Sequence, residues 1–478
     1  MLMEAISVLD IFKIGVGPSS SHTMGPWRAA QRFLEHLRTL GLLERCVRVR
    51  TDLYGSLAKT GRGHATDMAV ILGLSGEDPV TCEVEGLMAR VEAIKSSGRI
   101  RLRGEVDAEF DSDADLVFNF DKVLPYHANG IRFTALLDDG RRIVQTYYSV
   151  GGGFVVQEGE KPTGARAVSL PFPIEVAEDI TNHCRARGLD IPDIVWANEQ
   201  RWRSDDETRA GLWKIWRVMQ ECMHRGCHTD GILPGGLEVT RRARGIHDKL
   251  IADDATPETR RNIKAWIDAI KCSGRRFDQV LRWVSAFALA VNEENAAYGR
   301  VVTAPTNGAA GVIPAVMLYT WCFTPCDEDK IIQFMLTAGQ VGILFKKGAT
   351  ISAAMGGCQA EIGVSSAMAA AGLTQVLGGS VGQVLMAAEI AMEHHLGMTC
   401  DPIGGLVQVP CIERNTMGAM KAILAASIAM DSDPSKARVS LDGVIRTMWA
   451  TAQDMQAKYK ETSEGGLAVN VSVGIIEC

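Results

Sequence analysis

The chain has 478 residues, of which 46% are hydrophobic and 22% charged, and its net charge is −7. This length predicts two or more domains with sizeable cores, and the composition is that of a folded protein rather than a disordered one. The sequence contains no block of like charges of the kind that marks a nucleic-acid groove or a polybasic membrane contact, so neither kind of partner is expected.

The N-terminal segment lacks the features of a secretory signal. It has an acidic residue at Glu4, no basic region before its apolar residues and no small-residue cleavage site. The 12 cysteines of a chain without such a signal argue against a disulfide framework. We therefore expect a cytoplasmic protein.

The first third of the chain mixes strands and helices. Alternating hydrophobic residues predict a strand over Cys46–Tyr54, followed by a helix over residues 65–74. Further strands are predicted over residues 99–103, 115–120, 131–137 and 143–150. Because some pairs are joined by polar turns such as Asp138-Asp139-Gly140, we expect a partly antiparallel sheet.

The rest of the chain has a different character, and the predicted fold class is α+β. A mixed α/β domain covers residues 1–154, a linker without periodicity covers 155–173, and a larger all-helical domain covers 174–478. Helical spacing predicts helices over residues 199–223, 259–270, 277–295, 327–345 and 416–430.

Residues 362–388 carry no charge, a run long enough to span a bilayer. The run is rich in Gly, Ser, Gln and Ala and poor in Leu, so we interpret it as buried helices of a large domain rather than a membrane span. Glycine pairs occur at residues 356–357, 378–379, 404–405 and 465–466. They indicate either helix ends that converge on a cofactor or tight helix packing. The glycine content taken alone favours tight packing.

Three cysteines lie in Gly- or Pro-containing breaks between predicted helices: Cys358, Cys400 and Cys411. Three thiolates can hold a cubane [4Fe–4S] cluster and leave one iron open as a Lewis acid. The spacing of these cysteines differs from the compact run of cysteines in ferredoxins. Judged by spacing alone, the three cysteines are better interpreted as small buried hydrophobic residues than as ligands. Zinc sites usually contain close C-x-x-C pairs, and the sequence has none.

The other cysteines have weaker contexts. Cys478 is the last residue of the sequence and follows an apolar tail. It is interpreted either as a ligand that caps the fourth iron or as an accidental end residue. Cys222 and Cys227 lie close to His224 and His228, but the spacing is less regular than in zinc sites.

Four motifs together carry a resemblance to a known family. They are Gly17-Pro-Ser-Ser-Ser-His-Thr23, Gly61-Arg-Gly-His64, Ala304-Pro-Thr-Asn-Gly-Ala-Ala-Gly311 and Cys400-Asp-Pro-Ile-Gly-Gly-Leu-Val-Gln-Val-Pro-Cys411. With Gly356-Gly-Cys358, they make the chain resemble the bacterial iron–sulfur L-serine dehydratases over nearly its whole length, in the single-chain form.

The resemblance implies a [4Fe–4S] cluster held by Cys358, Cys400 and Cys411, with Cys478 as a fourth ligand that the substrate displaces. It also implies a regulatory-type N-terminal domain, a homodimer, and an active site between the two domains. The implied reaction removes water from L-serine and yields pyruvate and ammonia.

Histidine is suited to remove the Cα proton of serine, because its ordinary pKa is about 6.5. We predict His64 as the general base, although a surface-loop histidine is the alternative without the resemblance. His22 and His127 are further catalytic candidates. His394 or His395, at the end of a predicted helix before Cys400, is expected to support the cluster.

Hydroxyl groups beside His22 are predicted to bind the substrate carboxylate at a helix N-terminus, although Ser21 or Thr23 can instead cap that helix. The predicted substrate-binding residues are Ser19, Ser20, Ser21, Thr23, Thr306, Asn307 and Gly308.

Two rival functions remain open. A pyridoxal-phosphate eliminase would use residues 305–311 as its phosphate loop and Lys346 or Lys347 as its Schiff-base lysine, but both lysines suit a solvated helix end. A binding or sensor protein would keep the cluster without turnover.

Overall fold

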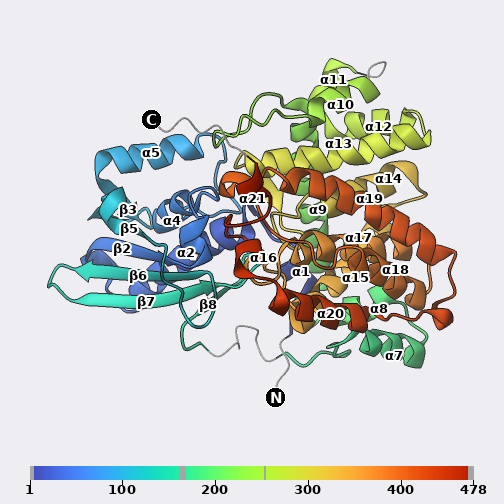
Figure 1. Cartoon of the computed structure of the whole chain (residues 1–478), viewed down its shortest axis with the longest axis horizontal. Coiled ribbons are helices and arrows are strands. Elements are labelled where there is room, and N and C mark those ends of the chain that lie inside the picture. The colour runs from blue at the N-terminus through green and yellow to red at the C-terminus, as the bar shows by residue number, and fades with distance from the viewer. Residues whose placement is uncertain (1–4, 161–167, 252–254, 472–478) are drawn as a thin grey trace.

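The N-terminal third of the protein forms a mixed sheet flanked by helices in the computed structural model, which describes residues 5–160, 168–251 and 255–471 (Figure 1). The sheet order is β3-β4-β2-β6-β7-β8, with β5 also paired to β2. β2 is parallel to β4 and β5, whereas β2–β6, β6–β7 and β7–β8 are antiparallel, so the predicted partly antiparallel sheet is confirmed. The strands are β2 (Cys46–Tyr54), β3 (Arg99–Leu102), β4 (Val106–Glu109), β5 (Leu116–Asn119), β6 (Gly130–Leu137), β7 (Arg142–Ser149) and β8 (Val155–Gln157).

Alternating burial along the strands explains why helices cover the sheet. The odd-numbered positions of β6 from Ile131 to Leu137 are buried, and the even-numbered ones between them are partly exposed. Trp27 and Phe33 of α2 share one hydrophobic core with Phe133 and with residues of α4. The helices of this region are α2 (Gly25–Thr39), α3 (Ser56–Lys59), α4 (Thr66–Leu74), α5 (Leu87–Ser97) and α6 (Ser112–Asp115).

The remainder of the chain is a larger helical domain built around α17 (Ile362–Val376), every residue of which is buried. Small Gly, Ala and Ser side chains let α15, α18 and α19 pack closely around it. The domain contains α7 (Ala177–Arg187), α8 (Ile191–Glu199), α9 (Asp205–His228), α10 (Ala243–Leu250), α11 (Pro257–Arg261), α12 (Ile263–Cys272), α13 (Phe277–Ala296), α14 (Val312–Phe323), α15 (Glu328–Gly348), α16 (Ala353–Gly356), α18 (Val381–Glu393), α19 (Cys411–Met430), α20 (Leu441–Asp454) and α21 (Leu467–Asn470).

The uncharged run over residues 362–388 forms α17, which is fully buried as predicted, and the start of α18, where buried and partly exposed residues alternate. Within the described part of the chain, no helix combines the length and apolar character needed to cross a membrane.

Several predicted boundaries differ from the structure. The helix predicted from residue 199 begins at Asp205, because the Ser204 side chain caps it and accepts a hydrogen bond from Glu207 N. The helix predicted over residues 259–270 is divided at Asn262, whose side chain caps α12. Strand β8 lies inside the segment predicted as a linker.

The N-terminal segment crosses between the two folding units. α1 (Val8–Ile11) packs in the hydrophobic core of the helical domain, and β1 (Ile14–Val16) pairs with β9 (Arg300–Val302). The chain then enters the sheet domain through α2. This crossing places residues 17–24 at the boundary of the two domains.

Candidate active site

Loops from both domains converge at this boundary. Residues Ser20–Met24 form a π-helical turn that leads into α2, and the 61–64 turn precedes α4. A Cβ atom on Gly63 would lie 2.5 Å from the carbonyl oxygen of Gly405, so only glycine lets this turn approach the segment between Cys400 and Cys411. The sequence motifs therefore meet in space.

His22 and His64 lie side by side, with 4.6 Å between their ring centroids. The Thr23 hydroxyl donates to the backbone oxygen of His64 at 2.7 Å, and the Thr66 hydroxyl donates to that of His22 at the same distance. Both imidazoles are buried. These reciprocal hydrogen bonds fix the two histidine-bearing turns against each other.

The hydrogen-bond partners assign the protons of the neutral imidazoles. His64 Nδ1 lies 2.9 Å from the Thr60 carbonyl oxygen, which can only accept, so Nδ1 carries the proton and Nε2 has a free lone pair. His22 Nε2 lies 3.0 Å from Ser56 Oγ, whose own proton is donated to the Glu461 carbonyl oxygen. Nε2 of His22 therefore donates, and Nδ1 holds the lone pair.

Both lone pairs face one carboxylate. Glu461 Oε1 lies 3.5 Å from His22 Nδ1 and 3.5 Å from His64 Nε2, and the other oxygen, Oε2, is buried without a hydrogen-bond partner among the described residues. Burial lowers the pKa of His22 to about 4, against the opposing charge of Glu461. Burial alone raises the pKa of Glu461, but the two histidines outweigh it and hold that pKa below its ordinary value.

A second cluster lies on the helical side. Ligand atoms of Cys358, Glu361 and Cys400 all lie within 4.8 Å of one another, and the three residues are buried. The thiols of Cys358, Cys400 and Cys411 form no disulfide. A hydrogen bond from Cys400 and the nearby Arg414 lower the pKa of Cys358, whereas burial and then the charge of Cys358 raise that of Cys411.

The start of α19 brings a cation to these thiols. Cys411 is the first residue of this helix and Arg414 follows three positions later, on the same face. The Arg414 guanidinium donates to Thr399 O at 2.6 Å and to Asp401 Oδ1 at 3.0 Å, and it also interacts with Cys358. Cys478 lies outside the described residues.

The two clusters are joined through the C-terminal segment. Glu461 N donates to Cys400 O at 2.9 Å, and Cys400 N donates to Tyr459 O at 2.8 Å. Glu461 has φ +57°, in the left-handed region. Sequence reasoning missed Glu461, Glu361 and Arg414, since their importance arises only when distant loops meet.

The predicted serine-rich motif is buried, and most of its hydroxyls bind within the turn. Ser19 Oγ accepts from His22 N at 3.1 Å, Ser21 Oγ lies 2.9 Å from His22 Nδ1, and Thr23 Oγ1 accepts from Ser19 N at 3.1 Å. The Ser20 hydroxyl has no such bond within the described residues. Ser19 is therefore the residue that caps the turn.

The 304–311 loop also reaches the site. Asn307 Nδ2 donates to Asn295 Oδ1 at 3.0 Å and to Val16 O at 3.3 Å, which leaves Asn307 Oδ1 buried without a partner among the described residues. A Cβ atom on Gly308 would lie 2.6 Å from Glu361 Oε2, and Thr306 is buried beside them.

The other predicted histidines have separate surroundings. His127 Nδ1 accepts from Asn129 N at 3.0 Å, and burial lowers the pKa of His127 to about 4. The charge of Glu461 also reaches His127, so this histidine lies near the first cluster. His395 is buried against α17, with Nδ1 2.6 Å from Ala391 O, whereas His394 caps the C-terminus of α18.

The group of Cys222, Cys227, His224 and His228 does not assemble a metal site in the described structure. His224 Nε2 is 3.0 Å from Thr259 O, and His228 Nδ1 is 2.7 Å from His224 O. The centroids of the two imidazoles lie 4.4 Å apart with the rings tilted by 46°, and both thiols are buried in the helical core. These residues support packing.

Comparisons with known proteins cover almost the whole chain. Residues 7–160 match the family model of the serine dehydratase beta chain, and residues 186–468 match that of the serine dehydratase alpha chain. The chain is 51% identical to the L-serine dehydratase of Streptomyces coelicolor, over 99% of this chain and 100% of the relative. It is 48% identical to that of Mycobacterium tuberculosis, with the same coverages, and 44% identical to L-serine dehydratase 1 of Escherichia coli, over 98% and 99% of the two chains. The chain therefore belongs to the serine dehydratase family, with alpha-chain and beta-chain regions in one polypeptide.

Proposed function

We propose that this protein dehydrates L-serine to aminoacrylate, which yields pyruvate and ammonia, and that it does so with an iron–sulfur cluster. The observation that supports the proposal most strongly is the junction of two buried clusters. Glu461 faces His22 and His64 with its carboxylate and hydrogen-bonds the backbone of Cys400 with its amide. Proton-transfer groups thus stand beside thiols suited to metal binding.

The thiol cluster has the chemistry that a [4Fe–4S] cluster requires. Cys358, Cys400 and Cys411 are buried and free, and Arg414 supplies a positive charge that offsets the charge of thiolates. Bound there with three protein ligands, the cluster supplies an open iron as a Lewis acid for the substrate hydroxyl. We propose Cys478 as the fourth ligand of the resting enzyme.

His64 is the proposed general base that removes the Cα proton. Its Nδ1 proton is held by Thr60 O, so its Nε2 lone pair is fixed toward the site interior. Glu461 orients this ring and stabilises the imidazolium that forms. The His22 Nε2–H donates its hydrogen bond to Ser56 Oγ. His22, His64 and His127 are the three histidines whose charges act on Glu461.

Substrate binding is proposed for the two polar loops. The unpartnered Asn307 Oδ1 can accept a hydrogen bond from the substrate ammonium, and the Ser20 hydroxyl can donate to the carboxylate. Ser19, Ser21 and Thr23 shape this turn, while Thr306 and Gly308 hold the facing loop. The aminoacrylate product needs no further catalyst, because it tautomerises and hydrolyses in water.

The pyridoxal-phosphate alternative has less support. Lys347 Nζ is ion-paired with Glu175 at 2.6 Å, and Lys346 stands over the ring of Phe154, so neither belongs to the two clusters. The proposed enzyme acts in the cytoplasm as a homodimer without nucleic-acid or membrane partners. The free cysteines of the described chain agree with a reducing compartment.

Turnover of L-serine by anaerobically purified protein tests the function. Pyruvate formation should be rapid, should be lost in air, and should persist with hydroxylamine, which captures pyridoxal phosphate. His64→Ala should lower kcat by roughly 10²–10⁴-fold, the usual contribution of a general base, at unchanged iron content. His183→Ala, on α7, is the control. Parental turnover by His64→Ala excludes this base, and no turnover by the iron-loaded parent favours a sensor.

A further inference from the structure

Two buried asparagines from different elements meet beside the candidate active site. Asn295 lies in the last turn of α13, and Asn307 lies in the 304–311 loop. Both side chains are buried, and Asn307 Nδ2 donates to Asn295 Oδ1 at 3.0 Å. Asn295 Nδ2 donates in turn to the Pro18 carbonyl oxygen at 2.7 Å. The two amides therefore form a chain of hydrogen bonds from the serine-rich motif to the loop.

Backbone carbonyl groups fix which way each of these amides points. A carbonyl oxygen only accepts hydrogen bonds, so Pro18 O requires the NH2 group of Asn295, and Asn295 Oδ1 then faces Asn307. Asn307 must present its NH2 group to that oxygen. Val16 O, which lies 3.3 Å from Asn307 Nδ2, requires the same orientation. Asn307 Oδ1 is thereby left as an acceptor without a partner among the described residues.

The backbone of the loop is held separately, from the helical domain. Asn415 of α19 donates from Nδ2 to Gly308 O at 2.7 Å, and its Oδ1 accepts from Gly311 N at 3.1 Å. These bonds fix the course of the loop on both sides of residue 309 but do not involve the Asn307 side chain. The orientation of the Asn307 amide therefore depends on its own hydrogen bonds.

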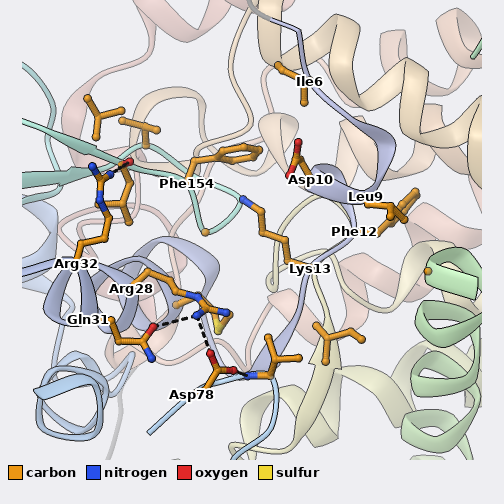
Figure 2. Close-up of a pocket in the computed structure, with 18 of the residues that line it drawn as sticks. Ile6, Leu9, Asp10, Phe12, Lys13, Arg28, Gln31, Arg32, Asp78 and Phe154 are labelled. Atoms are coloured by element: carbon orange, nitrogen blue, oxygen red, sulfur yellow. Dashed lines mark hydrogen bonds and ion pairs between the residues drawn. The ribbon is translucent and has the colours of Figure 1, made fainter. Parts of the chain in front are cut away.

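The unpartnered acceptor does not face the open space between the two domains. A cavity of about 1320 Å³ opens there, and Figure 2 shows Phe12 and Lys13, which directly precede β1, among its lining residues. The described residues that line this cavity include none of the 304–311 loop. Asn307 Oδ1 is therefore shielded from this space. Because buried polar atoms normally have a hydrogen-bond partner, a donor on a bound ligand accounts for this one.

We propose that Asn295 is a positioning residue that makes the site select an ammonium group. An ammonium only donates hydrogen bonds, so it fits Asn307 Oδ1 and is repelled by an NH2 group in the same place. Of the two bonds that hold the Asn307 amide, the one to Asn295 is shorter, at 3.0 Å against 3.3 Å for Val16 O. This inference rests on the proposed function, in which Asn307 accepts a hydrogen bond from the ammonium of L-serine.

Calorimetric titration of anaerobically purified full-length protein tests the inference, in the His64→Ala background so that the substrate is not consumed. The probes are L-serine and 3-hydroxypropanoate, which has the same hydroxyl and carboxylate but no ammonium. The measured quantity is the ratio of their dissociation constants. Asn295→Leu removes the acceptor for Asn307 Nδ2, and it should reduce the preference for L-serine by about tenfold, as for the loss of one charged hydrogen bond. Asn295→Ala removes the same acceptor and serves if Asn295→Leu does not fold.

Two further variants separate positioning from a purely structural role. Asn295→Asp keeps an accepting oxygen toward Asn307 in either protonation state, so it should retain most of the preference for L-serine. Asn198→Leu is the matched control, because Asn198 is a buried asparagine of α8 that holds another segment through Phe172 N and O. It should lower stability and leave the preference unchanged.

An unchanged preference in Asn295→Leu, or an equal loss in Asn198→Leu, overturns the inference while L-serine binding still supports the proposed function. A His64→Ala protein that does not bind L-serine overturns both.

Discussion

At the scale of single residues, hydrogen-bond acceptors of three side chains meet at the centre of the site. Glu461 Oε1 and the unprotonated nitrogens of His22 and His64 face one another in a buried position, where like-charged or lone-pair contacts are costly. In the proposed mechanism, the Glu461 carboxylate beside His64 stabilises the imidazolium that forms when His64 takes the Cα proton.

Glu461→Gln tests this stabilisation. The amide keeps the size of the side chain but removes its negative charge, so kcat for L-serine should fall by roughly 10²-fold while KM changes little. Glu464→Gln, in the same segment but exposed and paired with Lys59, is the matched control. Steady-state kinetics measure both. Equal kcat values in the two variants would remove Glu461 from the reaction.

The residues of the site differ in how visible they are in the sequence. Cys358, Cys400 and His64 could be proposed as site residues, because they lie in the motifs that carry the family resemblance; their Gly- or Pro-rich contexts alone favour buried cysteines and a surface-loop histidine. Glu461 and Arg414 could not, because an acid in a polar tail and an arginine on a helix resemble ordinary solvated groups. Only the hydrogen bonds of Glu461 with Cys400 and of Arg414 with Thr399 reveal their positions.

At the scale of elements, tight turns and helix ends position the chemistry. The 61–64 turn packs against the Gly404 and Gly405 backbone, and α19 begins at Cys411. Strand β2 and helix α4 could be predicted closely from alternation and apolar periodicity. The insertion of α1 into the helical core could not, since its short apolar run is compatible with either domain.

Gly63→Ala should weaken the contact between the turn and the Cys400–Cys411 segment. The added Cβ would meet Gly405 O at 2.5 Å, so the backbone must shift, and the free energy of unfolding should fall by roughly 1–3 kcal/mol. Gly245→Ala is a control in α10, where a Cβ has open space and should stabilise the helix by about 0.5–1 kcal/mol. Urea unfolding measures both. A stable Gly63→Ala protein would show that the close approach is dispensable.

Helix α10 contains a histidine, His247, that contacts Trp266 of α12 and should make stability depend on pH. His247 Nε2 accepts from Trp266 Nε1 at 3.0 Å, and burial lowers the pKa of His247 to about 4. The unfolded chain therefore takes up a proton near pH 6.5, before the folded protein does. The contribution of neutral His247 to the free energy of unfolding is therefore present above pH 6.5 and is lost as the pH falls toward 4.

His247→Gln removes this titration. The stability lost between pH 7 and pH 5 should be smaller in the variant than in the parent by about 2 kcal/mol, from the difference between a pKa of 6.5 and one of about 4. Unfolding curves at the two pH values give this difference. Equal losses would mean that His247 is protonated in the folded protein as readily as in the unfolded one.

At the scale of the whole molecule, the sheet domain and the helical domain each supply half of the site. The sheet domain carries His22 and His64, and the helical domain carries the thiols. The C-terminal segment ties them together, since Ser56 and Thr60 of the sheet domain donate to Glu461 O while Glu461 N binds Cys400. The site therefore exists only when both domains are docked.

We propose that three thiols of the helical domain hold one iron–sulfur cluster. The most direct test of this proposal is iron and sulfide quantitation on anaerobically purified protein, beside Cys358→Ser, Cys400→Ser and Cys411→Ser. The exposed Cys272→Ser variant is the control. We predict about four iron and about four sulfide ions per chain in the parent and control, and a large loss in each of the other variants. Protein without iron and sulfide, or a full complement in all three variants, would mean that these thiols do not hold such a cluster.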